Sequence, residues 1–254
     1  MLEIIDHGAV REIRLARPPV NALSSALLAA LEQALLAAEQ AAAEGAAGPR
    51  ALVLSGAAGM FSAGLDVREL NSGEAAVRAL VGAFARVQAT LVQSRLPVIA
   101  AITGHSPAGA AVLAVLCDHR IMAAGPFRIG LNEVQVGLYP GELIFRVFER
   151  VVGKQRAASW LPRGALVSGA EALAAGLIDE LVDPAQVVPR SLALGAELAA
   201  LPPQAYARTR ALVRQDLRQL FAQPPESLES LMAEGWVTDE TRAQLAKLLA
   251  PRGA

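Results

Sequence analysis

The sequence predicts an α/β fold followed by a helical C-terminal region, and three observations support this prediction. Short apolar runs that suit buried strands alternate with long Ala- and Leu-rich stretches up to about residue 188. Beyond that point the pattern is helical only, with Pro pairs at 202 and 224 as breaks. The 254 residues are 54% hydrophobic, which is enough for one large core. We therefore expect a core at residues 1–189 and a helical region at residues 190–254.

Five segments of the predicted core are typical of strands. Residues 10–16 partly alternate between polar and apolar side chains, as a half-buried strand does. Residues 51–56 and 97–104 are apolar runs, which favours buried strands. Two shorter candidates follow at residues 119–124 and 127–131.

Two long helices are predicted between these strands. The first spans residues 24–45, where Ser24 can cap the N-terminus and Gly45 can end the helix. The second fills residues 73–95. Strands interleaved with helices indicate an α/β core.

The composition argues against several classes of function. With 23 basic and 24 acidic residues and no basic block, the chain shows no signature of nucleic-acid binding. The histidines His7, His105 and His119 are far apart in sequence and lack metal-ligand spacing, so we expect no metal site. The single cysteine, Cys117, lies in an apolar run, which indicates a small buried residue and fits a reducing compartment.

The chain is expected to be cytoplasmic, without a membrane partner. Its N-terminal segment, "MLEIIDHGAVREIRLARPPVN", lacks a basic stretch followed by an apolar one, so no targeting peptide is visible. Residues 96–118 are long and apolar enough to span a membrane, but His105 and Pro107 interrupt them. Two short buried elements are therefore predicted there.

Two loops are candidate ligand sites. Residues 59–67, "GMFSAGLDV", follow a predicted strand, and their small residues would let a ligand approach main-chain N–H groups, although an ordinary tight turn has the same composition. In "TGHSPAGAAVLAVLCD", Ser106 is a good N-cap and Pro107 a good first helical residue. The helix is apolar on all sides and therefore buried, so its free N–H groups near Gly109 would face a cavity and could hold a partial negative charge.

Five motifs carry a resemblance to a known family. They are, in order, "PPVNALS", "FSAGLDV", "ITGHSPAGAAVLAVLCDHRIMA", "IGLNEVQVGL" and "EALAAGLIDELVD". Each is weak alone, but together they make the chain resemble the enoyl-CoA hydratase/isomerase (crotonase) superfamily over about residues 17–183. The resemblance implies a spiral of ββα units, binding of acyl-CoA thioesters, and C-terminal helices used to assemble a homotrimer or a dimer of trimers.

The resemblance also implies roles for individual residues. The family's oxyanion hole, a pair of main-chain N–H groups that binds the thioester oxygen and stabilises an enolate, falls on Ala63 and Gly109. Hydratases of the family use two glutamates, whose positions fall on Val112 and Glu133. Substrate contacts are expected from Gly64, Leu65, Asp66 and Asn132. For Asp66 and Asn132 a structural role is the alternative.

A single retained acid, Glu133, is the pattern of the Δ3,Δ2-enoyl-CoA isomerases. Moving a double bond from carbon 3 to carbon 2 requires removal of a proton from carbon 2 and return of one to carbon 4, which one carboxylate can perform. Apolar neighbours should raise the pKa of Glu133 and make it a better base. The expected function is isomerisation of 3-enoyl-CoA to trans-2-enoyl-CoA, with no cofactor besides the CoA of the substrate. Hydration or other enolate chemistry and a non-catalytic acyl-CoA-binding subunit are the alternatives.

One departure from the family pattern lies at the helix start. Where the family usually has further glycines, Ala108 and Ala110 flank Gly109. The added methyl groups are expected to narrow the pocket or to change which acyl chains fit.

Overall fold

The computed structural model describes residues 1–45 and 48–250, in which the strands form two sheets. The larger sheet has the order β1-β2-β3-β5-β7-β10, and the smaller has the order β4-β6-β8-β9. The predicted strands at residues 10–16, 51–56, 97–104, 119–124 and 127–131 are confirmed as β2, β3, β5, β7 and β8. The strands are β1 (Leu2–His7), β2 (Val10–Leu15), β3 (Ala51–Ser55), β4 (Gly59–Met60), β5 (Val98–Ile102), β6 (Gly104–Pro107), β7 (His119–Ala123), β8 (Arg128–Gly130), β9 (Val167–Ser168) and β10 (Glu180–Val182).

Both long helices are present. They are α1 (Ser25–Glu44) and α3 (Glu74–Gln93), and the hydroxyl of Ser24 accepts a hydrogen bond from the N–H of Leu27 at 3.1 Å, which caps α1. The other helices are α2 (Val67–Leu70), α4 (Gly109–Leu116), α5 (Gly141–Val152), α6 (Lys154–Trp160), α7 (Gly169–Ala174), α8 (Val187–Ala199), α9 (Pro203–Val213), α10 (Gln215–Ala222), α11 (Leu228–Ala233) and α12 (Asp239–Leu249), with the 3-10 helices η1 (Glu133–Val136), η2 (Leu161–Arg163) and η3 (Pro184–Gln186).

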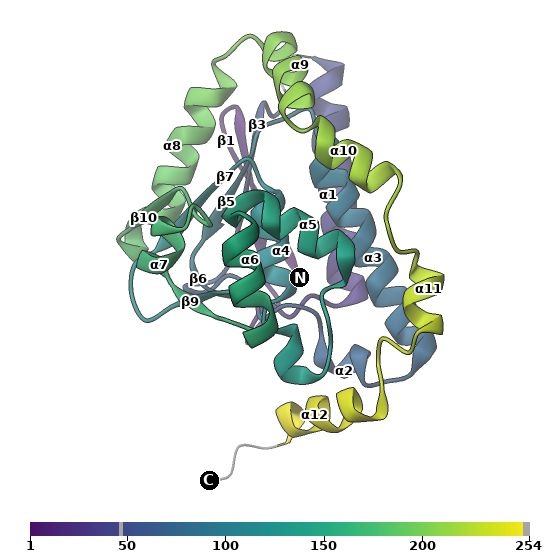
Figure 1. The fold of residues 1–254 in the computed structure, drawn as a ribbon. Coiled ribbons are helices and arrows are strands. Elements are labelled where there is room, and N and C mark those ends of the chain that lie inside the picture. The colour runs from purple at the N-terminus through teal and green to yellow at the C-terminus, as the bar shows by residue number, and fades with distance from the viewer. Residues whose placement is uncertain (46–47, 251–254) are drawn as a thin grey trace.

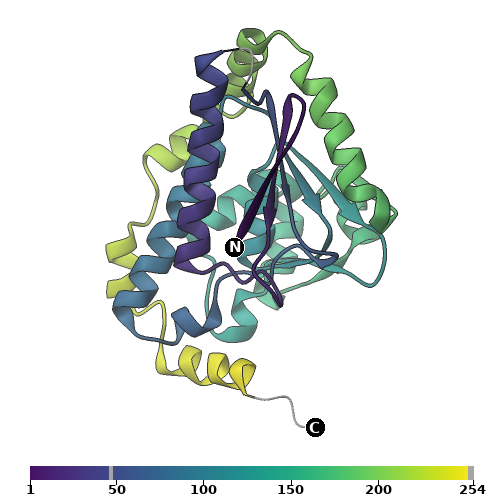
Figure 2. The ribbon, with the colours of Figure 1, turned by 180° about the vertical axis from the view of Figure 1, so that it is seen from behind.

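Helices cover both faces of the larger sheet, as Figures 1 and 2 show. From β2 to β10 its strands are parallel, and only β1 pairs in antiparallel fashion. In β3, Leu52 and Leu54 face the core formed with α1, α3 and α4, while Ala51 and Val53 face α8. This double burial explains why β5 is apolar throughout and β3 is apolar up to its last residue, Ser55.

The helix start predicted at Ser106 is wrong. Ser106 and Pro107 belong to β6, and α4 begins at Gly109. The N–H of Ala108 donates to the carbonyl of Gly130 at 2.8 Å, which extends the pairing of β6 with β8. Sheet pairing has therefore overridden the local capping signal, and Ala108 is the residue at which the chain turns into the helix.

The stretch suspected of spanning a membrane, residues 96–118, folds into the short buried elements β5, β6 and α4. One helix of the described residues, α3, is long and apolar enough to cross a membrane by length and composition. Its residues Leu80, Val87 and Leu91 are fully buried in the core against neighbouring elements. Burial of this face is what a core helix of a folded domain requires.

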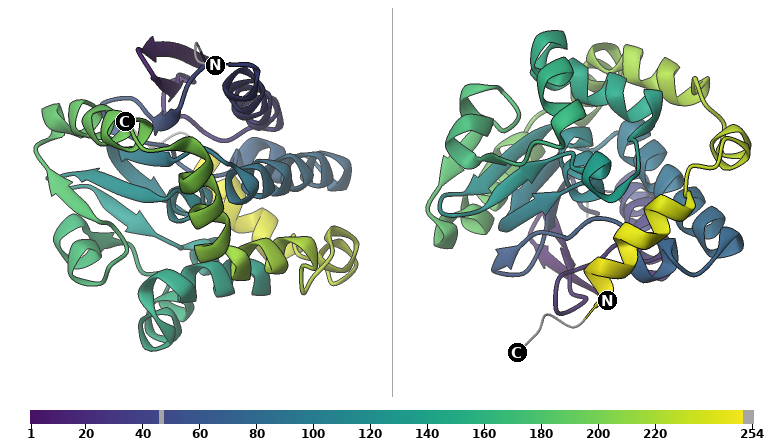
Figure 3. Two further views of the ribbon diagram at one scale, coloured as in Figure 1. Left: turned by 90° about the horizontal axis from the view of Figure 1, so that it is seen from above. Right: turned by 60° about the horizontal axis from the view of Figure 1, so that its bottom comes forward.

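The C-terminal region is described as far as residue 250 and wraps around the core. Its predicted beginning at residue 190 falls inside α8, which packs on the larger sheet. Helices α10 and α11 lie along α3, and α12 lies next to α2, at the bottom of Figure 1 and in front in the right-hand view of Figure 3. The α12 helix thus sits beside the segments that follow β4 and β8.

A buried cluster of ion pairs connects the segment of α9 and α10 to the core. The carboxylate of Asp118 accepts hydrogen bonds from Arg210 at 2.9 Å and Arg214 at 2.5 Å, and both arginines are at most 5% exposed. Arg210 also donates to the carbonyl of Leu91 at 2.9 Å, near the end of α3. Cations at a helix C-terminus complement its dipole, so this cluster holds the C-terminal region against the end of α3.

Candidate active site

Three neighbouring strands of the smaller sheet deliver the predicted functional groups. Strands β4, β6 and β8 are parallel, with Gly59 opposite Gly104 and Ser106 opposite Ile129. The chain then enters the 61–66 loop after β4, helix α4 after β6, and η1 after β8. Because the carboxyl ends of parallel strands meet at one edge of a sheet, the three segments converge. They line a single cavity of about 560 Å³.

The loop after β4 is held in place by residues 20–23. The N–H of Leu23 donates to the carbonyl of Gly64 at 2.8 Å, and the N–H of Asp66 donates to the carbonyl of Leu23 at 3.0 Å. Since successive residues of an extended chain point their backbone groups to opposite sides, the N–H of Leu65 points away from Leu23. Within residues 1–45 and 48–250 this N–H has no hydrogen-bond acceptor.

The expected oxyanion donor Ala63 is therefore corrected. Its N–H donates to the carbonyl of Val20 at 2.9 Å and is not available to a ligand. The free N–H of Leu65 lies close to Gly109: a Cβ atom built on Gly109 would be 3.5 Å from the Leu65 nitrogen. The N–H of Gly109 is the first of α4 and has no intrahelical acceptor. Leu65 and Gly109, both in the cavity wall, are the pair of free donors at this site.

Gly64 has a packing role, not the substrate contact that was expected of it. Its φ of +85° is in the region that favours glycine, and a Cβ there would lie 3.1 Å from the Ala108 methyl and 3.3 Å from the Gly109 nitrogen. Its own N–H donates to the Ser62 hydroxyl at 3.2 Å. The absence of a side chain at Gly64 is what brings the Leu65 loop against the start of α4.

Asp66 is also occupied structurally. Its carboxylate accepts a hydrogen bond from the N–H of Arg68 at 2.9 Å, which caps α2, and pairs with Arg17 at 2.7 Å. The side chain is 7% exposed and does not reach the cavity wall. These contacts therefore support a structural role for Asp66, which was the alternative to a substrate contact.

Glu133 lies at the first position of η1, in the wall of the cavity. Its Oε2 atom is buried and has no hydrogen-bond partner in the part of the chain that the structure describes. Burial raises the pKa of Glu133 from 4.5 to about 7, as its apolar neighbours predicted. Asn132 also lines the cavity, and its side chain does not cap η1. A carboxylate whose pKa is raised by burial in this way is suited to take up a proton near neutral pH.

The rest of the cavity is largely apolar. Val112, the position of the second hydratase acid, is 1% exposed and presents only methyl groups to the wall. Of the two alanines beside Gly109, Ala108 lines the cavity and Ala110 is fully buried in α4, so only the Ala108 methyl can narrow the pocket. Ala108 also has a φ of +50°, which is strained for a residue with a side chain.

The C-terminal region supplies part of the wall, including a carboxylate that the sequence analysis missed. Trp236 and Leu245 contribute apolar surface, and Glu226 lies at the first turn of α5. The Oε2 atom of Glu226 accepts a hydrogen bond from the N–H of Glu142 at 2.8 Å, which caps α5. Glu226 therefore already has a structural partner, unlike Glu133.

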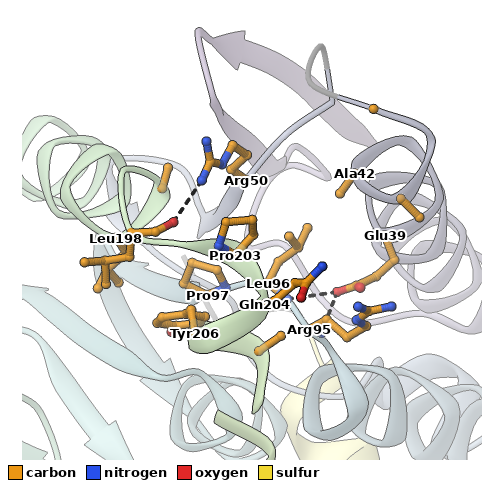
Figure 4. Close-up of a pocket in the computed structure, with 15 residues that line it drawn as sticks. Glu39, Ala42, Arg50, Arg95, Leu96, Pro97, Leu198, Pro203, Gln204 and Tyr206 are labelled. Carbon is orange, nitrogen blue, oxygen red and sulfur yellow. Dashed lines mark hydrogen bonds between the residues drawn. The ribbon is translucent and has the colours of Figure 1, made fainter. Parts of the chain in front are cut away.

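A second cavity, of about 450 Å³, lies at the opposite end of the larger sheet, where residues before β3 and β5 contribute to it (Figure 4). Arg50 in its wall donates to the carbonyl of Leu201 at 2.8 Å. Glu39 accepts hydrogen bonds from the Ser94 hydroxyl at 2.5 Å and the Arg95 N–H at 3.0 Å. This cavity lies at the amino ends of the strands. Its charged side chains Glu39 and Arg50 already form hydrogen bonds to other residues of the protein.

Two other residues considered from sequence have structural roles. The Nδ1 atom of His105 accepts a hydrogen bond from the N–H of Arg128 at 3.2 Å, and the ring packs edge-on against Phe127. Cys117 is buried, and burial raises its pKa to about 12. Within the described residues no cluster of His, Cys, Asp or Glu has the arrangement of a metal site.

The geometry agrees with the motifs, and comparison with known proteins decides the family. The model of the family "Enoyl-CoA hydratase/isomerase" matches residues 6–241. The chain belongs to the enoyl-CoA hydratase/isomerase family. Human mitochondrial enoyl-CoA delta isomerase 1 is 36% identical over 216 residues, which are 83% of this chain and 69% of that protein. A Rhizobium meliloti protein named "Probable enoyl-CoA hydratase" is 29% identical over 248 residues, covering 97% and 94% of the two chains.

The fold comparison agrees with this assignment. The crystal structure of human mitochondrial delta3-delta2-enoyl-CoA isomerase superposes with a TM-score of 0.88 and 29% identity, over 98% of this chain and 96% of that one. The predicted crotonase fold with a helical C-terminal region is confirmed. Relatives named as isomerases and relatives named as hydratases are both similar to this chain. The choice between the two reactions therefore depends on the residues of the site.

Proposed function

We propose that the protein isomerises 3-enoyl-CoA to trans-2-enoyl-CoA, with Glu133 as the only acid and base. The observation that carries this proposal is the buried Oε2 atom of Glu133, which has no hydrogen-bond partner among the described residues and lies in the wall of an apolar cavity. The family resemblance places the other hydratase acid at Val112, in the same wall. The free N–H groups of Leu65 and Gly109 line the same cavity. Isomerisation needs these groups and no more.

In this mechanism the thioester carbonyl oxygen accepts hydrogen bonds from the N–H groups of Leu65 and Gly109. Their stabilisation of the negative oxygen of the enolate, roughly 3 kcal/mol for each donor by analogy with acyl-transfer enzymes, makes the proton on carbon 2 removable. Glu133 takes that proton, and the electron pair moves into the enolate. The enolate then collapses toward carbon 4, which receives the proton back from Glu133 while the double bond forms between carbons 2 and 3. No atom is gained or lost, so no cofactor beyond the CoA of the substrate is required.

The pKa of Glu133 suits such a shuttle. With a pKa of about 7 the carboxylate is ionised in a large fraction of molecules at neutral pH, and its protonated form is still a competent acid. An apolar wall that includes Val112, Trp236 and Leu245 excludes water, which would otherwise compete for the proton.

Hydration of trans-2-enoyl-CoA is the second candidate, and the likeness to proteins named as hydratases favours it. A water that attacks carbon 3 needs two acidic side chains to position and activate it, and Val112 has no group that can do so. We therefore expect the rate of isomerisation to exceed the rate of hydration.

The test offers 3-decenoyl-CoA and trans-2-decenoyl-CoA to the wild type and to Glu133→Gln, and follows the absorbance of the conjugated thioester. The wild type should convert the first substrate faster than it hydrates the second, and Glu133→Gln should do neither. Glu142→Gln, a neighbouring acid that pairs with Arg146, is the matched control and should keep the wild-type rate. Faster hydration would favour the hydratase, and inactivity of the wild type on both substrates would favour a non-catalytic subunit.

We also propose that the chain forms a homotrimer through its C-terminal helices. Support comes from the end of α9, where the large apolar residues Leu212 and Val213 are 70% and 59% exposed. Sedimentation should give a trimer for the wild type and smaller species when both residues are changed to Asp. A monomeric wild type, or a variant that is still trimeric, would contradict this assembly.

A further inference from the structure

One polar side chain in the wall of the cavity is not used by the proposed mechanism. Gln88, on α3, is 4% exposed, and its Oε1 atom has no hydrogen-bond partner among residues 1–45 and 48–250. A buried amide oxygen without a partner destabilises a fold, so native proteins rarely contain one without a reason. Glu133 Oε2 is the other atom of this kind in the same wall.

The position of Gln88 makes its polarity unusual. Val81, Ala85 and Gln88 follow each other at helical spacing on α3, and all three line the cavity. Val81 and Ala85 are apolar, as are most of the other residues that line the cavity. Leu or Met at position 88 would continue the apolar stripe without leaving a polar atom unpaired.

Gln88 lies about one helical turn away from the part of the cavity wall at Gly109. Phe84, one helical turn before it, approaches the start of α4: a Cβ on Gly109 would be 3.3 Å from the end of the Phe84 ring. Gln88 is therefore about 6 Å further along α3 than Phe84, the residue that approaches Gly109. In the arrangement that we propose, the acyl chain runs along this side of the cavity, so that a substrate with its thioester oxygen on Gly109 meets Gln88 with carbons beyond the reacting ones.

We propose that Gln88 selects acyl chains that carry a hydroxyl group beyond the reacting carbons, so that the substrates of this site are hydroxylated 3-enoyl-CoA thioesters. The unpaired atom is an acceptor, and a hydroxyl group is the donor that an acyl chain most simply provides. A plain chain leaves Oε1 of Gln88 unpaired when bound, whereas the hydroxylated chain satisfies it. This inference rests on the proposed function, because it assumes that an acyl thioester occupies the cavity.

The test compares 3-decenoyl-CoA with a series of 3-decenoyl-CoA thioesters that carry one hydroxyl group at successive carbons beyond carbon 5. The wild type should show kcat/KM about ten-fold higher for one hydroxyl position than for the plain chain, as expected for one hydrogen bond to a buried group. Gln88→Met, which keeps the length of the side chain but accepts only weakly, should lose this preference and process the plain chain at least as fast as the wild type does. Gln93→Met, the same substitution at an exposed position of α3, is the control and should behave as the wild type.

Each outcome bears on one proposal. If the wild type does not isomerise the plain chain or any member of the series, the proposed function fails. If it isomerises the plain chain but prefers no hydroxyl position, or if the preference persists in Gln88→Met, the inference about Gln88 is overturned. The wild-type series needs no variant, so it tests the preference whether or not Gln88→Met folds.

Discussion

The substitution Glu133→Gln tests the electrostatic core of the proposal, because it removes the charge and keeps the shape. The carboxyl of Glu133 has a pKa of about 7 since burial disfavours its charged form. For the wild type, kcat/KM should rise ten-fold per pH unit up to about pH 7 and then level off, as the base becomes ionised. Glu133→Gln should lower kcat/KM by roughly 10²–10⁴-fold and abolish this rise.

The same shift predicts a change of stability with pH. A rise from 4.5 to about 7 corresponds to about 3 kcal/mol of free energy of unfolding, at roughly 1.4 kcal/mol per pKa unit. The unfolded chain releases this proton near pH 4.5, whereas the folded chain keeps it up to about pH 7. The folded state thus binds more protons between these values, and its stability falls as the pH rises through them. Above pH 7 the whole penalty is present.

The assay is urea unfolding of wild type and Glu133→Gln at several pH values from 4 to 8. Because all other groups titrate alike in the two proteins, the difference in their free energies of unfolding isolates position 133. Relative to its value at pH 4, this difference should move in favour of Glu133→Gln by about 3 kcal/mol at pH 8. A difference that is constant with pH, or that moves in favour of the wild type, would refute the argument that Glu133 is buried without compensation. Glu142→Gln should give a difference without this trend.

Three further substitutions test how the site is held. Asp66→Ala breaks the ion pair with Arg17 and the cap of α2. It should lower the free energy of unfolding in urea by roughly 2 kcal/mol with little change in KM. A raised KM without a loss of stability would indicate that Asp66 contacts the substrate. Gly64→Ala, at a φ of +85°, should destabilise by about 1–2 kcal/mol and lower kcat at least ten-fold in the thioester assay, and full activity would contradict the tight loop packing. Thr241→Val removes the hydrogen bond at 2.7 Å to the carbonyl of Gly137, four residues after Glu133. It should lower kcat more than it raises KM, with recovery in Thr241→Ser, and an unchanged kcat would exclude a positioning role.

Periodicity predicted most of the fold because burial and spacing are properties of the sequence itself. Strands β3 and β5 are apolar, apart from Ser55 at the end of β3, since both of their faces are covered, and α1 has a Ser cap at its predicted start. Strand β1 was missed for the converse reason. Its burial pattern has no alternation and none of its residues is fully buried, because it lies at the edge of the sheet and pairs with β2 alone.

The free N–H groups of the cavity wall show where prediction from sequence ends. The motif "FSAGLDV" locates the loop, but which N–H is free depends on how residues 61–66 pair with residues 20–23. The carbonyl of Val20 accepts a hydrogen bond from the N–H of Ala63. The turn at Gly64 then directs the N–H of Leu65 away from residues 20–23. This pairing is a contact between segments about forty positions apart, so no local pattern could reveal it.

Glu133 and Gln88 differ in how visible they are to sequence analysis. A carboxylate within an apolar run is conspicuous, whereas Gln88 lies on an amphipathic helix in which polar residues are ordinary. Only the structure shows that position 88 faces inward. Glu226 was missed for another reason, because it reaches the wall from a segment more than eighty residues beyond α5's first turn.

The cavity can also be identified as the functional site by its energetic cost. Its wall holds the unpaired Oε2 of Glu133, the unpaired Oε1 of Gln88 and the strained φ of +50° at Ala108. Each of these features costs on the order of 1–3 kcal/mol, and, unlike the unpaired atoms of Thr103, Ser106, Arg120 and Arg214, they lie beside a space that a ligand can enter. Strain and unmet hydrogen bonds persist where a bound ligand offsets them. These features are independent of the family motifs, and they lie in the same wall of the protein, where the ends of β4, β6 and β8 meet.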